Sequence, residues 1–177
     1  GDTGGMTGTY NIGLGYRSGY TLTTGSTNIL IGKEAGRNMT LGDNNVIMGS
    51  GAGYSIIGAA FTGGNNVIIG RDAGKYGTQT ERVVAIGYEA GGAFGGGLAD
   101  DSVAVGSYAL KLSTGAKNIG IGSGAGDAIT TGSNNTIIGD YAGTTTLADT
   151  VAIYAGTTER LRVTSSGLTI NGSALAS

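Results

Sequence analysis

The chain has 177 residues, 38 of them glycine, and it contains no proline, cysteine, histidine or tryptophan. The formal net charge is −2 and the few basic residues are scattered, so we expect no nucleic-acid partner. The absent cysteines and histidines exclude a disulfide framework and leave poor means of holding a metal, so we expect no metal and no cofactor. The longest apolar runs are about four residues, against the roughly 20 that cross a bilayer, so we expect no membrane insertion.

One phrase recurs along the chain: an apolar triplet, a glycine, and then, in most copies, Ala-Gly three and four residues later. Successive copies are 17, 17, 21, 17, 19, 16 and 17 residues apart. Because glycine is costly to order, a chain this rich in it folds only where a regular structure requires glycine at fixed positions. The glycine that follows each triplet is called the hallmark glycine here, and it stands at Gly15, Gly32, Gly49, Gly70, Gly87, Gly106, Gly122 and Gly139.

The repeats occupy residues 9–156 and follow a small, polar stretch, residues 1–8, that we interpret as the join to an upstream part of a longer protein. Each triplet is mostly β-branched and bounded by turn formers, which predicts a short strand. A ninth, degenerate copy covers residues 150–154. The predicted strands are 12–14, 29–31, 46–48, 67–69, 84–86, 103–105, 119–121 and 136–138.

A second apolar residue follows most hallmark glycines by about seven positions and leads into a polar, glycine-bearing turn. We expect a second short strand there, so that one repeat forms one coil. The predicted fold is therefore all-β, a parallel β-solenoid (β-roll) of eight or nine short coils. The second apolar positions are Leu22, Met39, Ile56, Phe94, Leu112 and Ile129.

The two faces of each predicted strand are both apolar, although a coil has only one interior. The first and third members of a triplet share one face and the middle member takes the other. We expect the first and third members to fill the interior, which leaves the middle members in need of cover. We infer an obligate oligomer in which the backbones of neighbouring chains come closest at Gly13, Ala85, Ala104, Gly120 and Ala152.

An asparagine precedes most of the predicted strands. Asparagine tolerates left-handed backbone conformations and can hydrogen-bond nearby backbone. This favours a structural ladder at one corner of the coil over a ligand-binding ladder. Its members are Asn28, Asn45, Asn66, Asn118 and Asn135.

The less regular repeats contain candidate loops at residues 54–64, 75–82 and 92–101, and loops are where binding usually occurs. Aromatic residues lie in or near these loops. Their flat, amphipathic rings suit stacking on sugars or contact with a protein loop, and the alternative is that they seal gaps between subunits. The candidate binding residues are Tyr54, Phe61, Tyr76, Tyr88, Phe94 and Tyr108.

Catalysis without histidine or cysteine would require a carboxylate pair, as in glycoside hydrolysis. Repeated charges at an outward turn usually serve solubility, so we do not expect an enzyme. The pair Asp100-Asp101 lacks the spaced oxygen ligands of a calcium motif. The other candidate carboxylates share the turn after the hallmark glycine, and they are Glu34, Asp72, Glu89 and Asp140.

The repeat pattern dissolves after residue 143. Residues 159–172 alternate polar and apolar types around a Ser-Ser-Gly turn, which predicts a β-hairpin. We expect residues 157–177 to form a C-terminal β cap or neck that ends the stack without an open edge.

The repeats NVIIGRDAG, VAIGYEAG, VAVGSYAL and NTIIGDYAG resemble those of trimeric autotransporter adhesin heads and of the glycine-rich regions of bacteriophage tail fibres, over about residues 9–156. The long spacings favour the phage type. The segment AGTTERLRVTSSGLTINGSALAS is similar to what often precedes the self-cleaving intramolecular chaperone of phage tail fibres and tailspikes. In that family the mature chain ends with a serine at the cleavage point. Ser177 fits this pattern, although a sequence cut at this position for any other reason would end in the same way.

The resemblance implies a homotrimer that lies outside the cell, on a virion tail fibre or a bacterial surface. Its expected function is non-enzymatic attachment to a bacterial surface glycan or outer-membrane protein. Three alternatives stay open: a bacterial surface trimeric adhesin, a polysaccharide-degrading tailspike, and a structural spacer. The family's recognition loops are not encoded by a motif, so the resemblance assigns no binding residue.

Overall fold

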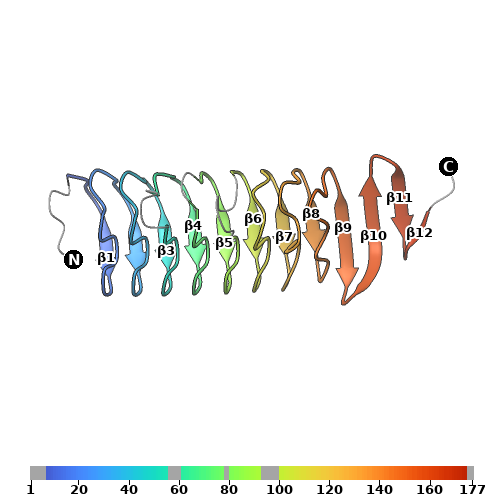
Figure 1. The fold of residues 1–177 in the computed structure, drawn as a ribbon, viewed down its shortest axis with the longest axis horizontal. Coiled ribbons are helices and arrows are strands. Elements are labelled where there is room, and N and C mark those ends of the chain that lie inside the picture. The colour runs from blue at the N-terminus through green and yellow to red at the C-terminus, as the bar shows by residue number, and fades with distance from the viewer. Residues whose placement is uncertain (1–6, 56–60, 78–79, 93–99, 175–177) are drawn as a thin grey trace.

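A single sheet of twelve strands runs the length of the computed structural model, which describes residues 7–55, 61–77, 80–92 and 100–174. Figure 1 shows the strands side by side along a column, from β1 at one end to β12 at the other. The described residues include no helix, and hence none that could span a membrane. The predicted all-β parallel β-solenoid is confirmed.

Eight strands of three residues coincide with the predicted triplets, and each pairs in parallel with the next. The pairing is in register, so Ile29 lies opposite Val46 and Val46 lies opposite Val67. Each coil, numbered here by its strand, therefore adds one strand to the sheet. The strands are β1 (Ile12–Leu14), β2 (Ile29–Ile31), β3 (Val46–Met48), β4 (Val67–Ile69), β5 (Val84–Ile86), β6 (Val103–Val105), β7 (Ile119–Ile121) and β8 (Thr136–Ile138).

The hallmark glycines stack on one another where each strand turns the corner of its coil. Gly49 has a φ of 132°, a backbone conformation that residues other than glycine rarely adopt. A Cβ at Gly49 would also lie 2.5 Å from the carbonyl oxygen of Gly70 in the next coil. The period of the sequence thus reflects both a backbone conformation and a close approach between coils.

From β2 to β9 the middle member of the triplet faces the interior of its coil and is buried, as at Ile47 and Ile68. Our prediction that the first and third members face inward is wrong. Those members are half-buried or exposed, and Ile121, for example, is 42% exposed. The turn after the hallmark glycine folds its alanine under the sheet, and these alanines are fully buried, so the interior has little room beyond one strand side chain. They are Ala35, Ala52, Ala73, Ala90, Ala109 and Ala125.

The small middle residues consequently do not lie where chains approach one another. Ala85, Ala104 and Ala152 are fully buried within their own chain. Gly120 is covered from inside by the side chain of Leu110. The oligomer contact inferred at these four positions is therefore also wrong, whatever the number of chains, whereas Gly13 in the first strand is exposed.

The return side of the coil does not form the second strand that we predicted. Its only pairing among the described residues is an isolated bridge between Met39 and Phe61. Turns replace the strand, and backbone bonds still join successive coils there; for example, the Thr23 amide donates to the carbonyl of Thr40 (3.0 Å).

Three of the predicted second apolar positions are buried, namely Leu22, Met39 and Ile129. Leu112 is 39% exposed, because Leu110 takes the interior place in that coil. Ile56 and Phe94 lie outside the described residues.

The predicted asparagine ladder is present and buried. In coil 3, the Asn45 Oδ1 accepts hydrogen bonds from the backbone amide (3.1 Å) and the Nδ2 (2.9 Å) of Asn66. The Nδ2 of Asn45 in turn donates to Asn28 Oδ1 (3.0 Å) and to the carbonyl of Gly63 (3.1 Å). Each asparagine therefore ties its coil to both neighbours, which supports the structural interpretation.

The sheet continues beyond the coils as an antiparallel meander. The strand β9 (Val151–Ala155) pairs in parallel with β8 and antiparallel with β10 (Thr158–Thr164). The predicted hairpin is formed by β10 and β11 (Gly167–Ile170), and β12 (Ser173–Ala174) follows. These strands prolong the sheet along the column, as Figure 1 shows.

Candidate functional site

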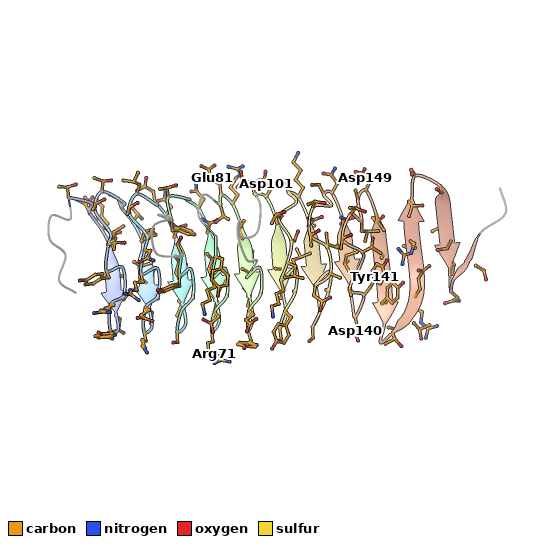
Figure 2. The ribbon with its side chains drawn as sticks, in the orientation of Figure 1. Arg71, Glu81, Asp101, Asp140, Tyr141 and Asp149 are labelled. Atoms are coloured by element: carbon orange, nitrogen blue, oxygen red, sulfur yellow. The ribbon has the colours of Figure 1, made fainter. Side chains whose placement is uncertain are left out.

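The turns that follow the hallmark glycines form one long edge of the column, which we call the tyrosine edge (residues 16–20, 33–37, 50–54, 71–76, 88–92, 107–111, 123–127 and 140–142). Figure 2 shows Arg71, Asp140 and Tyr141 along this edge. The second residue of several of these turns has a left-handed φ, as at Asp72 (57°) and Glu89 (51°). This conformation places successive charged and aromatic side chains in line along the column.

Seven of the nine tyrosines lie on the tyrosine edge, and each has a cationic group within 6 Å of its ring centre. A cation over an aromatic face is attracted by the ring quadrupole, by about 0.5–1 kcal/mol at exposed sites. These contacts help to hold the rings in defined orientations. The pairs are Tyr16 with Arg17 (5.0 Å), Tyr20 with Arg17 (5.3 Å), Tyr54 with Arg37 (5.5 Å), Tyr76 with Lys75 (5.6 Å), Tyr88 with Arg71 (4.4 Å), Tyr108 with Lys111 (4.6 Å) and Tyr141 with Arg162 (4.5 Å).

Carboxylates of the same turns pair with several of these cations. Glu34 pairs with Arg37 (3.1 Å) within one turn, as Asp72 does with Lys75 (3.0 Å). Lys111 reaches back to Glu89 of the preceding coil (2.7 Å). The rings and charges of the edge thus form a network that crosses coils.

A hollow of about 70 Å³ opens on this edge between coils 4 and 5. It is lined by Asp72, Lys75, Tyr76, Glu89 and Gly92. Its wall combines an aromatic ring, a hydrogen-bond donor and two acceptors within one small space.

The ionisable groups around the hollow are tuned by their partners. The hydrogen bond to Asp72 raises the pKa of Lys75, and the hydrogen bond from Lys111 lowers the pKa of Glu89. Hydrogen bonding to Glu89, with a further contribution from Tyr108, raises the pKa of Tyr88 to about 12. At neutral pH the Glu89 carboxylate is therefore charged and the Tyr88 phenol is protonated.

An aromatic pair lies beside the hollow. The rings of Tyr88 and Tyr108 meet edge to face, with centres 5.1 Å apart and planes at 75°. Arg71 covers Tyr88 and Lys111 covers Tyr108. The aromatic surface thus extends from coil 4 to coil 6.

Four of the predicted binding residues lie on the tyrosine edge. Tyr76 lines the hollow, and Tyr88 and Tyr108 form the neighbouring aromatic pair. Tyr54 lies earlier on the edge, and its hydroxyl accepts a hydrogen bond from Arg37 (3.2 Å). Phe61 is fully buried and fills the interior of its coil. Phe94 lies outside the described residues.

The cations of this site were not among the predicted site residues. They stand one or five positions after a hallmark glycine, as Arg71, Lys75 and Lys111 do. This spacing is visible in the repeats. The pairing of Arg71 with Tyr88 could not be predicted from the sequence, because the two residues lie in different coils and are far apart in the sequence.

Most of the carboxylates considered for catalysis form ion pairs with lysine or arginine side chains. The Glu89 pKa is lowered, which is the opposite of what a general acid needs. Asp127, which the sequence did not suggest, has a pKa raised by burial and by the charge of Asp140. No described group of three or more acidic, histidine or cysteine residues could hold a metal.

The opposite edge of the column, which carries Glu81, Asp101 and Asp149 in Figure 2, is acidic. There Asp101 pairs with Arg82 (2.6 Å), and Asp100 accepts a hydrogen bond from the Glu81 amide (2.9 Å). Both aspartates of the Asp100-Asp101 pair thus join neighbouring coils.

The fold defines the class of protein: a parallel β-solenoid that ends in an antiparallel extension of the same sheet. Comparisons with protein-family models, curated proteins and solved structures find no match.

Proposed function

We propose that this chain is a receptor-binding segment of a homotrimeric fibre that attaches to a bacterial cell surface from outside the cell. The observation that carries the proposal is the outward face of the sheet, which remains apolar along the whole solenoid. The resemblance of the repeats to phage tail fibres and trimeric adhesins supplies the number of chains and the bacterial target.

The outward face consists of two rows, formed by the first and the third members of the triplets. Because every pairing is in register, the rows run without a break from β1 to β9. Only Thr136 among their members is polar. The third-member row consists of Leu14, Ile31, Met48, Ile69, Ile86, Val105, Ile121, Ile138 and Ile153.

Soluble monomers rarely expose a continuous apolar surface of this kind. Two further copies of the same chain, each presenting the same rows, would cover it around a common axis. The contact then uses the outward rows rather than the small middle residues. This arrangement leaves the tyrosine edge at the margin of the sheet, where it can meet a receptor.

Attachment to a surface glycan or an outer-membrane protein fits the chemistry of the tyrosine edge. Tyrosine and arginine are the side chains that most often dominate binding interfaces. The ordered repetition of similar turns also permits several contacts at once, which strengthens attachment without a strong single site. The ion pairs of Asp72 and Glu89 favour a non-enzymatic role.

The experiment that tests the proposal measures mass in solution and adhesion to cells. Sedimentation velocity of the chain is expected to give a trimer, and I69D with V67D is expected to give smaller species with retained strand signal in circular dichroism. The control K117D places a new acid on the opposite edge and should leave the trimer intact. A folded monomer at micromolar concentration, or no adhesion to any bacterial cell tested, would overturn the proposal.

A polysaccharide-degrading tailspike is the second candidate, and the raised pKa of Asp127 beside Asp140 favours it. Incubation with purified surface polysaccharide distinguishes the two. Shortening of the polysaccharide by the wild-type protein, lost in D127N and in D140N, would support the tailspike. A polysaccharide of unchanged length would support attachment alone.

A further inference from the structure

We infer that the hollow between coils 4 and 5 is a subsite for one neutral sugar ring. This inference rests on the proposed function and names the ligand of the tyrosine edge.

The lining of the hollow suits one face of a single polar ring. The volume of the hollow is about 70 Å³, below the roughly 300 Å³ at which enclosed ligand sites start, so a ring would lie against the hollow and remain partly in solvent. Tyr76 supplies a flat amphipathic surface, Lys75 a donor, and Asp72 and Glu89 acceptors. A sugar ring presents an apolar face together with hydroxyl groups that both donate and accept, so each of these wall groups has a counterpart on it.

The charge balance favours a neutral ligand over an acidic one. The hollow has two carboxylates and one ammonium group in its wall. The ammonium of Lys75 is already bound to Asp72, and the nearby Lys111 is bound to Glu89. An acidic sugar would place a third carboxylate beside the two already in the wall, and the like charges would repel one another.

The positions of the acceptors are fixed by the fold. Asp72 and Glu89 occupy equivalent places in successive turns, and the Glu89 amide donates to the carbonyl of Arg71 (3.1 Å). Their ion pairs with Lys75 and Lys111 orient the carboxylates further. Since a carboxylate offers about four acceptor positions, one ion pair leaves capacity for ligand hydroxyls.

A second ring of an oligosaccharide has a place beside the first. The edge-to-face pair of Tyr88 and Tyr108 continues the aromatic surface from the hollow toward coil 6. A chain of sugars is therefore expected to follow the tyrosine edge along the column.

The test uses saturation-transfer difference NMR on the whole chain. The probes are the methyl glycosides of glucose, galactose, mannose and N-acetylglucosamine, with methyl glucuronide as the acidic counterpart. At least one neutral glycoside is expected to receive saturation on its ring protons. Its affinity should fall at least ten-fold in Y76A and in D72N, the latter retaining the shape of aspartate and a residue that tolerates a left-handed φ.

The matched control is Y16A, which removes a tyrosine of the same edge in coil 1 and should leave the affinity unchanged. Circular dichroism and sedimentation confirm that each variant keeps its fold and association. Transfer to none of the neutral glycosides, a stronger signal from methyl glucuronide, or an equal loss in Y16A would each overturn the subsite.

Cell adhesion separates this inference from the proposed function. Adhesion that persists in wild type while every neutral glycoside fails to bind would remove the subsite and leave the attachment proposal standing. Absence of adhesion together with normal binding of a neutral glycoside would overturn the attachment proposal and leave the subsite standing.

Discussion

The side chain of Leu110 lies over Gly120 and fills the space that this middle residue of β7 leaves empty. A Cβ added at Gly120 would lie 2.8 Å from Leu110 Cγ. Leu110 stands where most coils carry glycine, and it has a left-handed φ of 47°. That conformation costs leucine about 1–2 kcal/mol, so the packing of this fully buried side chain must return more than it costs.

We predict that L110G and G120I each destabilise the protein and that the double variant recovers much of the loss. L110G removes a buried leucine, worth about 2–5 kcal/mol, and regains only part of it from the relaxed backbone. G120I alone meets Leu110 and also the carbonyl oxygen of Ala125, each 2.8 Å from an added Cβ, and overpacks the coil by about 1–3 kcal/mol, of which L110G relieves the part due to Leu110. The double variant recreates the arrangement of Gly36 with Ile47, where a Cβ on the glycine would lie 3.6 Å from Ile47 Cδ1.

Urea unfolding measures all three free energies of unfolding in this cycle. A coupling free energy of at least about 1 kcal/mol is expected for residues in direct contact. Additive losses would show that the two positions do not share one space.

We predict that G49A costs at least about 3 kcal/mol of stability or prevents folding. The added methyl group would meet the backbone of Gly70, which cannot move aside as a flexible side chain does. G156A is the matched control, since Gly156 also has a positive φ (59°) but an added Cβ there meets nothing within 4 Å. Its expected cost is about 1 kcal/mol, from the left-handed backbone alone. Thermal unfolding of the two variants tests this, and equal midpoints would contradict it.

We predict that N45A lowers the free energy of unfolding by about 3 kcal/mol or more. The substitution leaves several buried groups of the ladder without their partner, and each costs about 1–3 kcal/mol. N134A is the control, because the exposed Asn134 bonds only to Asp149 among the hydrogen bonds seen for its side chain (2.9 Å). That variant should lose about 1 kcal/mol, and a loss at Asn45 no larger than this would rule out the buried ladder as a source of stability.

We predict that Tyr88 ionises late in an alkaline titration, together with Tyr154, whose pKa is raised chiefly by burial. The folded protein holds the Tyr88 proton up to a pKa of about 12, against about 10 for an ordinary tyrosine. The folded state therefore binds this proton more tightly, and the resulting stability is present below about pH 10 and is lost as the pH rises toward 12. Ultraviolet absorbance of tyrosinate records the late component.

Two variants check the assignment of this titration. Y88F should remove the Tyr88 part of the late component and leave that of Tyr154. E89Q should move the Tyr88 part to lower pH, because the Glu89 carboxylate is the largest cause of the shift. A titration curve that is unchanged in Y88F would show that Tyr88 does not ionise late.

The strands and the period of the fold followed from the sequence because each depends on local chemistry. The triplet Val67–Ile69, for example, is β-branched and bounded by turn formers, and Asn66 precedes it at the ladder. The orientation of the triplets did not follow, since both faces of these strands are apolar. What decides it is the buried alanine of the turn, as at Ala73, which narrows the interior to one strand side chain.

The candidate site was only partly visible in the sequence for a related reason. Tyr76 and Tyr88 were recognised by type, but Arg71 reaches the ring of Tyr88 only because one turn stacks on the next. Phe61 shows the converse. It belongs to an irregular repeat that suggested an exposed loop, yet its ring is needed to fill the coil.

Because each coil adds one strand to the sheet, the length of the molecule is set by its number of repeats. Each added or removed repeat would move everything beyond it by one fixed increment of about 4.8 Å, without altering the immediate surroundings of any other repeat. Duplication of a repeat between Tyr20 and Tyr54 would therefore change the distance between these two rings and little else. The reach of the protein, and the spacing of its contacts on a surface, are thus adjustable in whole units.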